Sequence, residues 1–200
     1  MKKIITIALS FLILSSIFAS GDYDRNISFS MSLNKVGRDE IYFSDSNING
    51  ANLKDNRYIF PLIDGEDKTS LSSAVYFYCL HQTDQNINVS LLFSANDLDL
   101  LSESYMLVGQ SSKDIHLNYN VSVTNTATNE KIGEIVAKPL EKMSNSDRTI
   151  SFFLSAESAS STPVVSKIDM EVVAPRYEDG NQKFMDAQYA GYIIATVEYL

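Results

Sequence analysis

Two histidines and one cysteine are the residues of this sequence best suited to acid–base, metal or nucleophilic chemistry. A neutral imidazole can act as a general base or a zinc ligand, but no spacing around His81 and His116 suggests a zinc site or a catalytic triad. The motifs G-x-S-x-G and H-E-x-x-H and a phosphate-binding glycine loop are absent. Cys79 lies in the apolar run 74–80, which predicts a buried, inert thiol. We therefore expect surface histidines and no enzymatic site, metal or cofactor.

Clusters of acidic side chains are the other candidates for chemistry. The segment 45–50, D-S-N-I-N-G, fits the first half of a calcium loop, but its twelfth position is Asn56 instead of a bidentate carboxylate. We interpret the segment as a turn rich in Asn, Asp and Gly. Carboxylate pairs at 97/99 and 178/179 fall in loops, where solvated charge is the expected role.

The N-terminal residues have the layout of a secretory signal. Lys2 and Lys3 precede the apolar run 4–18, and small residues follow at 19–21. This run is too short to favour a membrane span, so residues 1–21 are interpreted as a cleaved signal peptide. The remainder has the length of one domain and a net charge of −11, where the full chain has −9. Such an acidic surface argues against nucleic acid as a partner.

Alternating apolar residues dominate the rest of the chain. The clearest examples are 27–33, in which serines separate four large apolar side chains, and 115–123. Pro61 suggests that its strand lies at an edge or contains a bulge. The segments that are predicted to be strands are 27–33, 41–43, 57–63, 74–81, 87–94, 105–108, 115–123, 131–137, 149–156, 164–174 and 189–200. Many short strands without helical periodicity predict an all-β, immunoglobulin-like sandwich, with a closed barrel as the alternative.

The final segment, 189–200, reads Y-A-G-Y-I-I-A-T-V-E-Y-L. One face of an extended strand here would carry small and apolar residues, and the other face would be mixed. Such a strand must pair with an earlier part of the chain or with another molecule. The residues of the first face are Gly191, Ile193, Ala195, Val197 and Tyr199.

The two ends of the chain together resemble the subunits of bacterial chaperone–usher pili. In that family the last strand carries alternating apolar residues, a glycine and a penultimate tyrosine, which Gly191 and Tyr199 match. The segment Y-A-G-Y also looks like the start of the last strand in colonisation-factor pilins of enteric bacteria. The single Cys79 favours the disulfide-free pilin groups.

The resemblance implies an incomplete sandwich, 37–200, that is completed by a donor strand from an N-terminal extension, 22–36. Partners would be a periplasmic chaperone, an outer-membrane usher and other pilin subunits, with the product an extracellular fimbrium. The last strand would form one wall of the receiving groove, and the Leu200 carboxylate would bind basic residues of the chaperone. The implied donor side chains are Ile27, Phe29, Met31 and Leu33.

Two other functions remain open from the sequence. A secreted sandwich that binds a host glycan or receptor could use some of the 11 tyrosines as binding residues. A secreted enzyme with a dispersed site is the third class.

Overall fold

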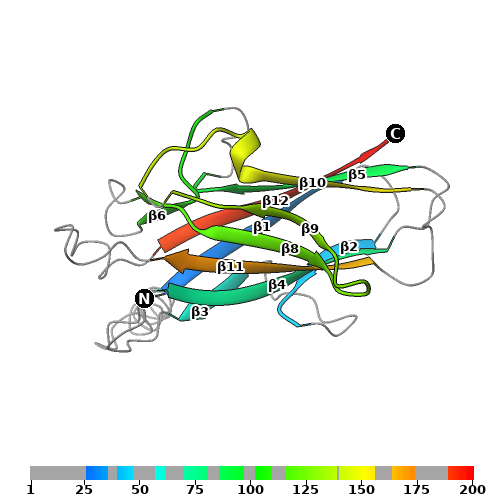
Figure 1. Ribbon diagram of the computed structural model, residues 1–200, viewed down its shortest axis with the longest axis horizontal. Coiled ribbons are helices and arrows are strands. Elements are labelled where there is room, and N and C mark those ends of the chain that lie inside the picture. The colour runs from blue at the N-terminus through cyan, green and yellow to red at the C-terminus, as the bar shows by residue number, and fades with distance from the viewer. Residues whose placement is uncertain are drawn as a thin grey trace, which may run out of the picture.

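The computed structural model describes residues 26–35, 40–46, 57–61, 70–80, 86–96, 102–109, 116–138, 140–155, 164–173 and 189–200. Its strands form two stacked layers, which confirms the prediction of an all-β sandwich (Figure 1). The expected signal peptide, His81 and the carboxylate pairs at 97/99 and 178/179 lie outside the described residues.

The larger layer, here called sheet A, has the order β10-β5-β12-β1-β3, with β6 paired to both β12 and β7. Pro61 ends β3, which lies at the edge of this sheet, as the proline suggested in the sequence. The strands of sheet A are β1 (Asn26–Lys35), β3 (Arg57–Pro61), β5 (Ile87–Ser94), β6 (Leu107–Gly109), β7 (His116–Leu117), β10 (Thr149–Leu154) and β12 (Tyr189–Tyr199).

The second layer, sheet B, has the order β2-β4-β11-β8-β9. A short 3-10 helix, η2 (Ser146–Arg148), precedes β10. Cys79 is 1% exposed within the core, which confirms the prediction of a buried thiol. The strands of sheet B are β2 (Glu40–Ser44), β4 (Ser70–Leu80), β8 (Asn120–Asn125), β9 (Lys131–Ile135) and β11 (Val164–Val173).

The segment 115–123 does not form the single strand that its alternation predicts. Within its described part, β7 pairs with β6 in sheet A, and β8 pairs with β11 and β9 in sheet B. The chain changes sheets at Asn118 and Tyr119, where the Asn118 side chain is 1% exposed. The alternation survives the crossing because the inner faces of both sheets point into the same core. Period two therefore identifies the buried apolar residues, but it misses the break and the burial of Asn118.

The Asn118 amide holds this crossing in place. Its Oδ1 accepts a hydrogen bond from the Met106 N–H at 2.9 Å, and its Nδ2 donates to the carbonyl of Lys138 at 2.8 Å. A second donation goes to the Glu141 carbonyl. One buried side chain thus satisfies backbone groups from two other segments, which would otherwise be costly to bury.

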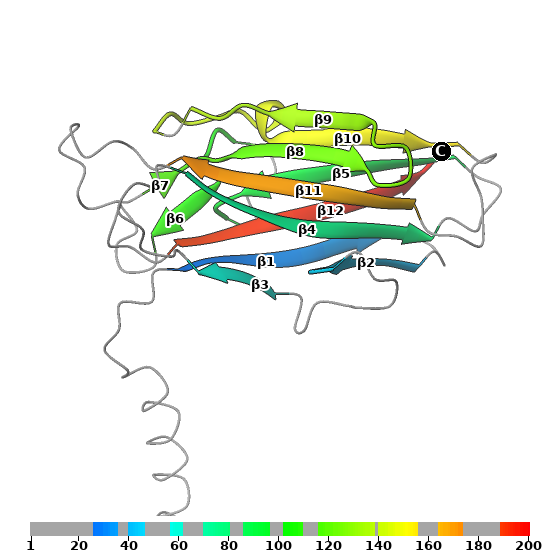
Figure 2. The same cartoon turned by 60° about the horizontal axis from the view of Figure 1, so that its bottom comes forward.

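The sheets approach closely where β9 and β10 lie at their edges (Figure 2). A Cβ added to Gly133 would stand 2.7 Å from Cγ2 of Ile150, so glycine is the residue that permits this approach. The register of β8 and β9 also shifts between Val123 and Thr124, which bends this edge.

Candidate functional site

The candidate functional site is the position that β1 occupies in sheet A, between β12 and β3 (Figure 2). β1 runs parallel to β12, with Ile27 opposite Tyr189 and Lys35 opposite Val197. Its first half also pairs antiparallel with β3. The strand proposed as donor therefore lies beside the strand proposed as groove wall, within one chain.

The inward side chains of β1 are part of the core. Phe29 is 0% exposed and Met31 is 5% exposed, whereas Ser30 between them faces outward. The Phe29 ring meets the edge of the Tyr119 ring, with centroids 5.4 Å apart and planes at 71°. Such edge-to-face pairs add about 0.5–1.5 kcal/mol beyond the area that they bury. The other two predicted donors, Ile27 and Leu33, have backbone positions opposite Tyr189 and Ala195, and their side chains lie outside the described set.

Gly191 in β12 leaves room for the residues around Phe29. A Cβ at this position would stand 2.8 Å from the Met106 carbonyl oxygen and 2.8 Å from Cδ2 of Leu107. It would also lie 3.3 Å from Cδ1 of Phe29. The glycine is therefore required by the chain at the start of β6, and the Phe29 ring of β1 leaves little further room.

The remaining predicted groove residues follow the expected alternation. Tyr199 is half-buried against the core, and Leu200 is 69% exposed, with its N–H donating to the Asn86 carbonyl at 2.9 Å. On the other face of β12, which looked mixed in sequence, Ile194 is also buried. The fully buried members of the predicted face are Gly191, Ile193, Ala195 and Val197.

Two buried tyrosines near β1, Tyr119 and Tyr189, were not among the predicted site residues. Tyr119, whose ring also contacts Phe93, has a buried hydroxyl that finds no hydrogen-bond partner in the described part of the chain. Burial raises the pKa of Tyr119 well above its usual value, and the nearby positive charge of Arg148 lowers it in part. Burial also raises the pKa of Tyr189. Alternation marked Tyr119 as inward-facing, but nothing local in the sequence placed it against Phe29.

Arg148 is a fully buried, positively charged residue near Tyr119. Its side chain is 0% exposed, and it donates hydrogen bonds to the carbonyls of Phe93 at 3.2 Å and Ser102 at 2.8 Å. These bonds join η2 to β5 and to the chain before β6. The arginine therefore has a structural role at the place where β5, η2 and the chain before β6 meet.

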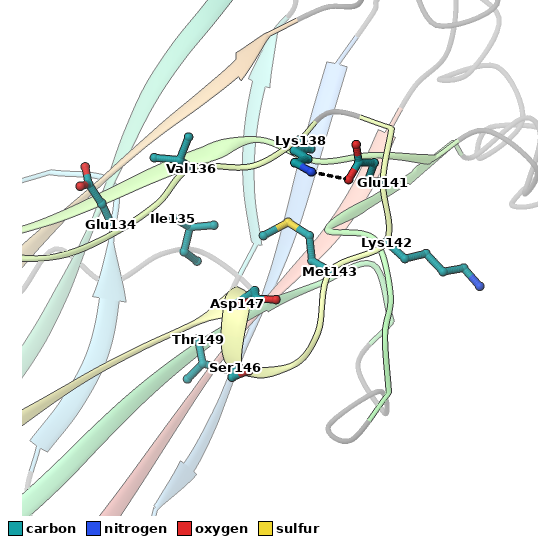
Figure 3. A pocket seen from close by; sticks show the side chains of 10 residues that line it. All are labelled: Glu134, Ile135, Val136, Lys138, Glu141, Lys142, Met143, Ser146, Asp147 and Thr149. Carbon is teal, nitrogen blue, oxygen red and sulfur yellow. Dashed lines mark hydrogen bonds and ion pairs between the residues drawn. The ribbon is translucent and has the colours of Figure 1, made fainter.

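A separate polar hollow of about 490 Å³ lies between the end of β9 and η2 (Figure 3). Met143 and Ile135 point toward its interior, and Lys138 is bonded to Glu141 at 2.8 Å on its rim. The hydrogen bond from Lys138 to Glu141 raises the pKa of the lysine. The lining offers hydrogen-bonding groups of both charges. Its residues are Glu134, Ile135, Val136, Lys138, Glu141, Lys142, Met143, Ser146, Asp147 and Thr149.

The residues considered for catalysis do not form a constellation in the described ranges. His116 is half-buried and stacks on Tyr105, with ring centroids 4.7 Å apart. The same ranges contain no group of three His, Cys, Asp or Glu side chains that could hold a metal ion. Of the predicted turn 45–50, only Asp45 and Ser46 are described.

No protein-family model, curated protein or solved structure matches the chain. Among the described residues, no helix is long and apolar enough to cross a membrane. The class that the described fold defines is an all-β sandwich whose N-terminal strand is paired to its last strand.

Proposed function

We propose that the protein is a structural subunit of an adhesive pilus, which polymerises when β1 of one subunit completes sheet A of the next. The observation that supports this most directly is the insertion of Phe29 and Met31 beside β12. Each side chain contributes about 1.5–3 kcal/mol on burial. The register of nine residue pairs adds a ladder of backbone hydrogen bonds.

A vacant β1 position explains why such a subunit would need partners. Without β1, the backbone of β12 would present a row of unpaired groups beside an apolar groove, which is an aggregation hazard. A chaperone that lends a strand in the periplasm would cover this edge, and an usher would hand the subunit to its neighbour. Because the contact joins the strand of one subunit to the groove of another, it does not close and generates a filament.

A strand-deletion experiment tests the proposal. Removal of residues 22–36 should leave a poorly folded subunit, and the same residues attached through a linker after Leu200 should restore a stable monomer. The matched control carries Phe29→Asp and Met31→Asp in the attached copy, which should restore much less because buried unpaired carboxylates are costly. A deleted chain that remains monomeric with an unchanged melting temperature would rule the proposal out.

Binding of a host glycan is the second candidate function, and the hollow beside β9 is the observation that favours it. Its carboxylates, hydroxyls and ammonium groups can exchange hydrogen bonds with sugar hydroxyls. A glycan array probed with the full chain tests this role. Glu134→Gln and Asp147→Asn should each weaken any signal, and a uniformly blank array counts against it.

A further inference from the structure

β10 is an edge strand of sheet A, at the side of the sandwich opposite β3. Within the described ranges its hydrogen-bonded partner is β5, on one side only. β9 of sheet B lies beside the first half of β10, where Gly133 meets Ile150, but no backbone hydrogen bond joins these two strands in the part of the chain that the structure describes (Figure 2). Beyond Ile150, Ser151 is exposed and Phe153 is 55% exposed. The second half of β10 therefore lies at an open rim, where an edge strand offers backbone groups for pairing.

The other edge strands that the structure describes carry features that oppose the addition of a strand. β3 contains Arg57 and ends at Pro61, and β2 begins with Glu40. β9 has Lys131, Glu134 and a shifted register against β8, and β7 is only two residues long. Charges, prolines, bulges and short length are the means by which sheets avoid edge-to-edge pairing. β10, T-I-S-F-F-L, has none of them, and its six pairs with β5 run without a shift.

The strands at this rim are uncharged, although the chain as a whole is strongly acidic. β5 and β10 contain no charged residue, whereas 20% of the residues in the chain are charged and its net charge is −9. By contrast, β11 of sheet B carries Lys167, Asp169 and Glu171. Two copies of an acidic chain repel each other, so they approach at the lowest cost where no charges are brought together. The open, neutral rim of β10 therefore favours a second copy of this chain as its partner.

We propose that two copies of the chain associate by antiparallel pairing of their β10 edges, with a two-fold axis at Phe153. This axis centres the contact on the half of β10 that lies beyond β9. The two exposed Phe153 rings then lie opposite each other, which is a favourable cross-strand pair, and Ser151 of each copy lies opposite Ser155 of the other. A two-fold contact closes on itself and gives pairs only. The contact does not depend on the proposed pilus function, and within pili it would join two filaments side by side.

Sedimentation velocity of the full chain over a concentration series tests the association, which should be a monomer–dimer equilibrium. Phe153→Lys should raise the dissociation constant about tenfold or more, because it places two like charges directly opposite each other. Leu140→Lys is the matched control, since Leu140 is 42% exposed between β9 and η2, and it should leave the constant within about twofold. Equal loss in both variants, or a chain that stays monomeric throughout, would overturn the inference. Multimers that grow beyond two and are unchanged by Phe153→Lys would support strand exchange while overturning the β10 contact.

Disulfide formation tests the register of the contact, in a Cys79→Ala background that removes the native thiol. After oxidation, S151C/S155C should give a covalent dimer on a non-reducing gel, because each new thiol faces the other kind in the second copy. S151C alone should stay monomeric, since the two copies of residue 151 would lie about 13 Å apart along the strands and a disulfide needs Cα atoms within about 7 Å. The same spacing prevents a bond between 151 and 155 within one chain. Absence of a dimer from the double variant, or equal cross-linking by S151C alone, would overturn the inference.

Discussion

Phe29 of β1 lies opposite Gly191 of β12, and its Cδ1 is 3.3 Å from the point where a Cβ on Gly191 would stand. The Met106 carbonyl oxygen lies 2.8 Å from the same point. Gly191 of the Y-A-G segment thus leaves space for the Phe29 ring of β1. A residue that looked like a family marker in sequence has a steric reason in the structure.

Gly191→Ala should lower the free energy of unfolding by about 1–3 kcal/mol, because the added methyl group meets a backbone oxygen that cannot move independently. Chemical denaturation measures the change. Ala190→Ser, at the half-buried neighbouring position, is the control and should change stability by less than about 0.5 kcal/mol. Equal stability of the two variants would show that β12 can shift to accept the methyl group.

Asn118→Ala should cost about 2–4 kcal/mol, because it leaves the Met106 N–H and the carbonyls of Lys138 and Glu141 without their buried partner. Asn118→Asp is the matched variant, since it keeps the acceptor for Met106 but loses both donated bonds. We expect it to be at least as damaging near neutral pH, where a buried carboxylate would face two carbonyl oxygens. Native-like melting of both variants would contradict this role for the amide.

Tyr119→Phe should raise the free energy of unfolding by about 1–2 kcal/mol, because it removes a buried hydroxyl that has no partner in the described structure. Tyr105→Phe is the control, since the Tyr105 hydroxyl donates to the Leu140 carbonyl in an exposed setting. That control should be neutral or slightly destabilising. Thermal denaturation of both variants checks the sign, and a destabilised Tyr119→Phe variant would indicate a partner for the hydroxyl.

Stability should fall steeply above pH 10. Burial raises the pKa of Tyr119 and Tyr189 in the folded chain, whereas an unfolded tyrosine ionises near its ordinary value of about 10. Their contribution is therefore complete below pH 10 and is lost as pH rises toward the folded-state values. Tyr119 alone should contribute a slope of about 1.4 kcal/mol per pH unit in this window. Denaturation series from pH 8 to 12 should show a shallower loss for Tyr119→Phe, and identical profiles would contradict the assignment.

Much of the pattern of inward-facing side chains was predictable from the sequence, because alternation depends on which side chains face the core. It placed Phe29 and Met31 inward and Ser30 outward, and it found both terminal strands. The direction of β1 was not predictable in this way, since a period-two pattern is the same when read backwards. Direction depends on the connection after Lys35 and on which strand lies next to β1.

The residues that surround β1 could not be predicted from the sequence, because they come from distant parts of the chain. Tyr119, Met106 and Arg148 converge there from segments that are distant along the chain. Only the sheet change at Asn118 brings Tyr119 against Phe29, and an asparagine within an alternating run carries no local signal of such a break.

The crossing at Asn118 also determines how wide the space for a first strand can be. The chain leaves sheet A at β7 and joins sheet B at β8 within two residues, so the two layers are tethered at that point. At this crossing the Tyr119 ring meets Phe29 of β1, with centroids 5.4 Å apart. If the strand exchange proposed above takes place, every strand that replaces β1 would need an aromatic or other large side chain at the height of Tyr119, because the same crossing would limit the space available to each of them.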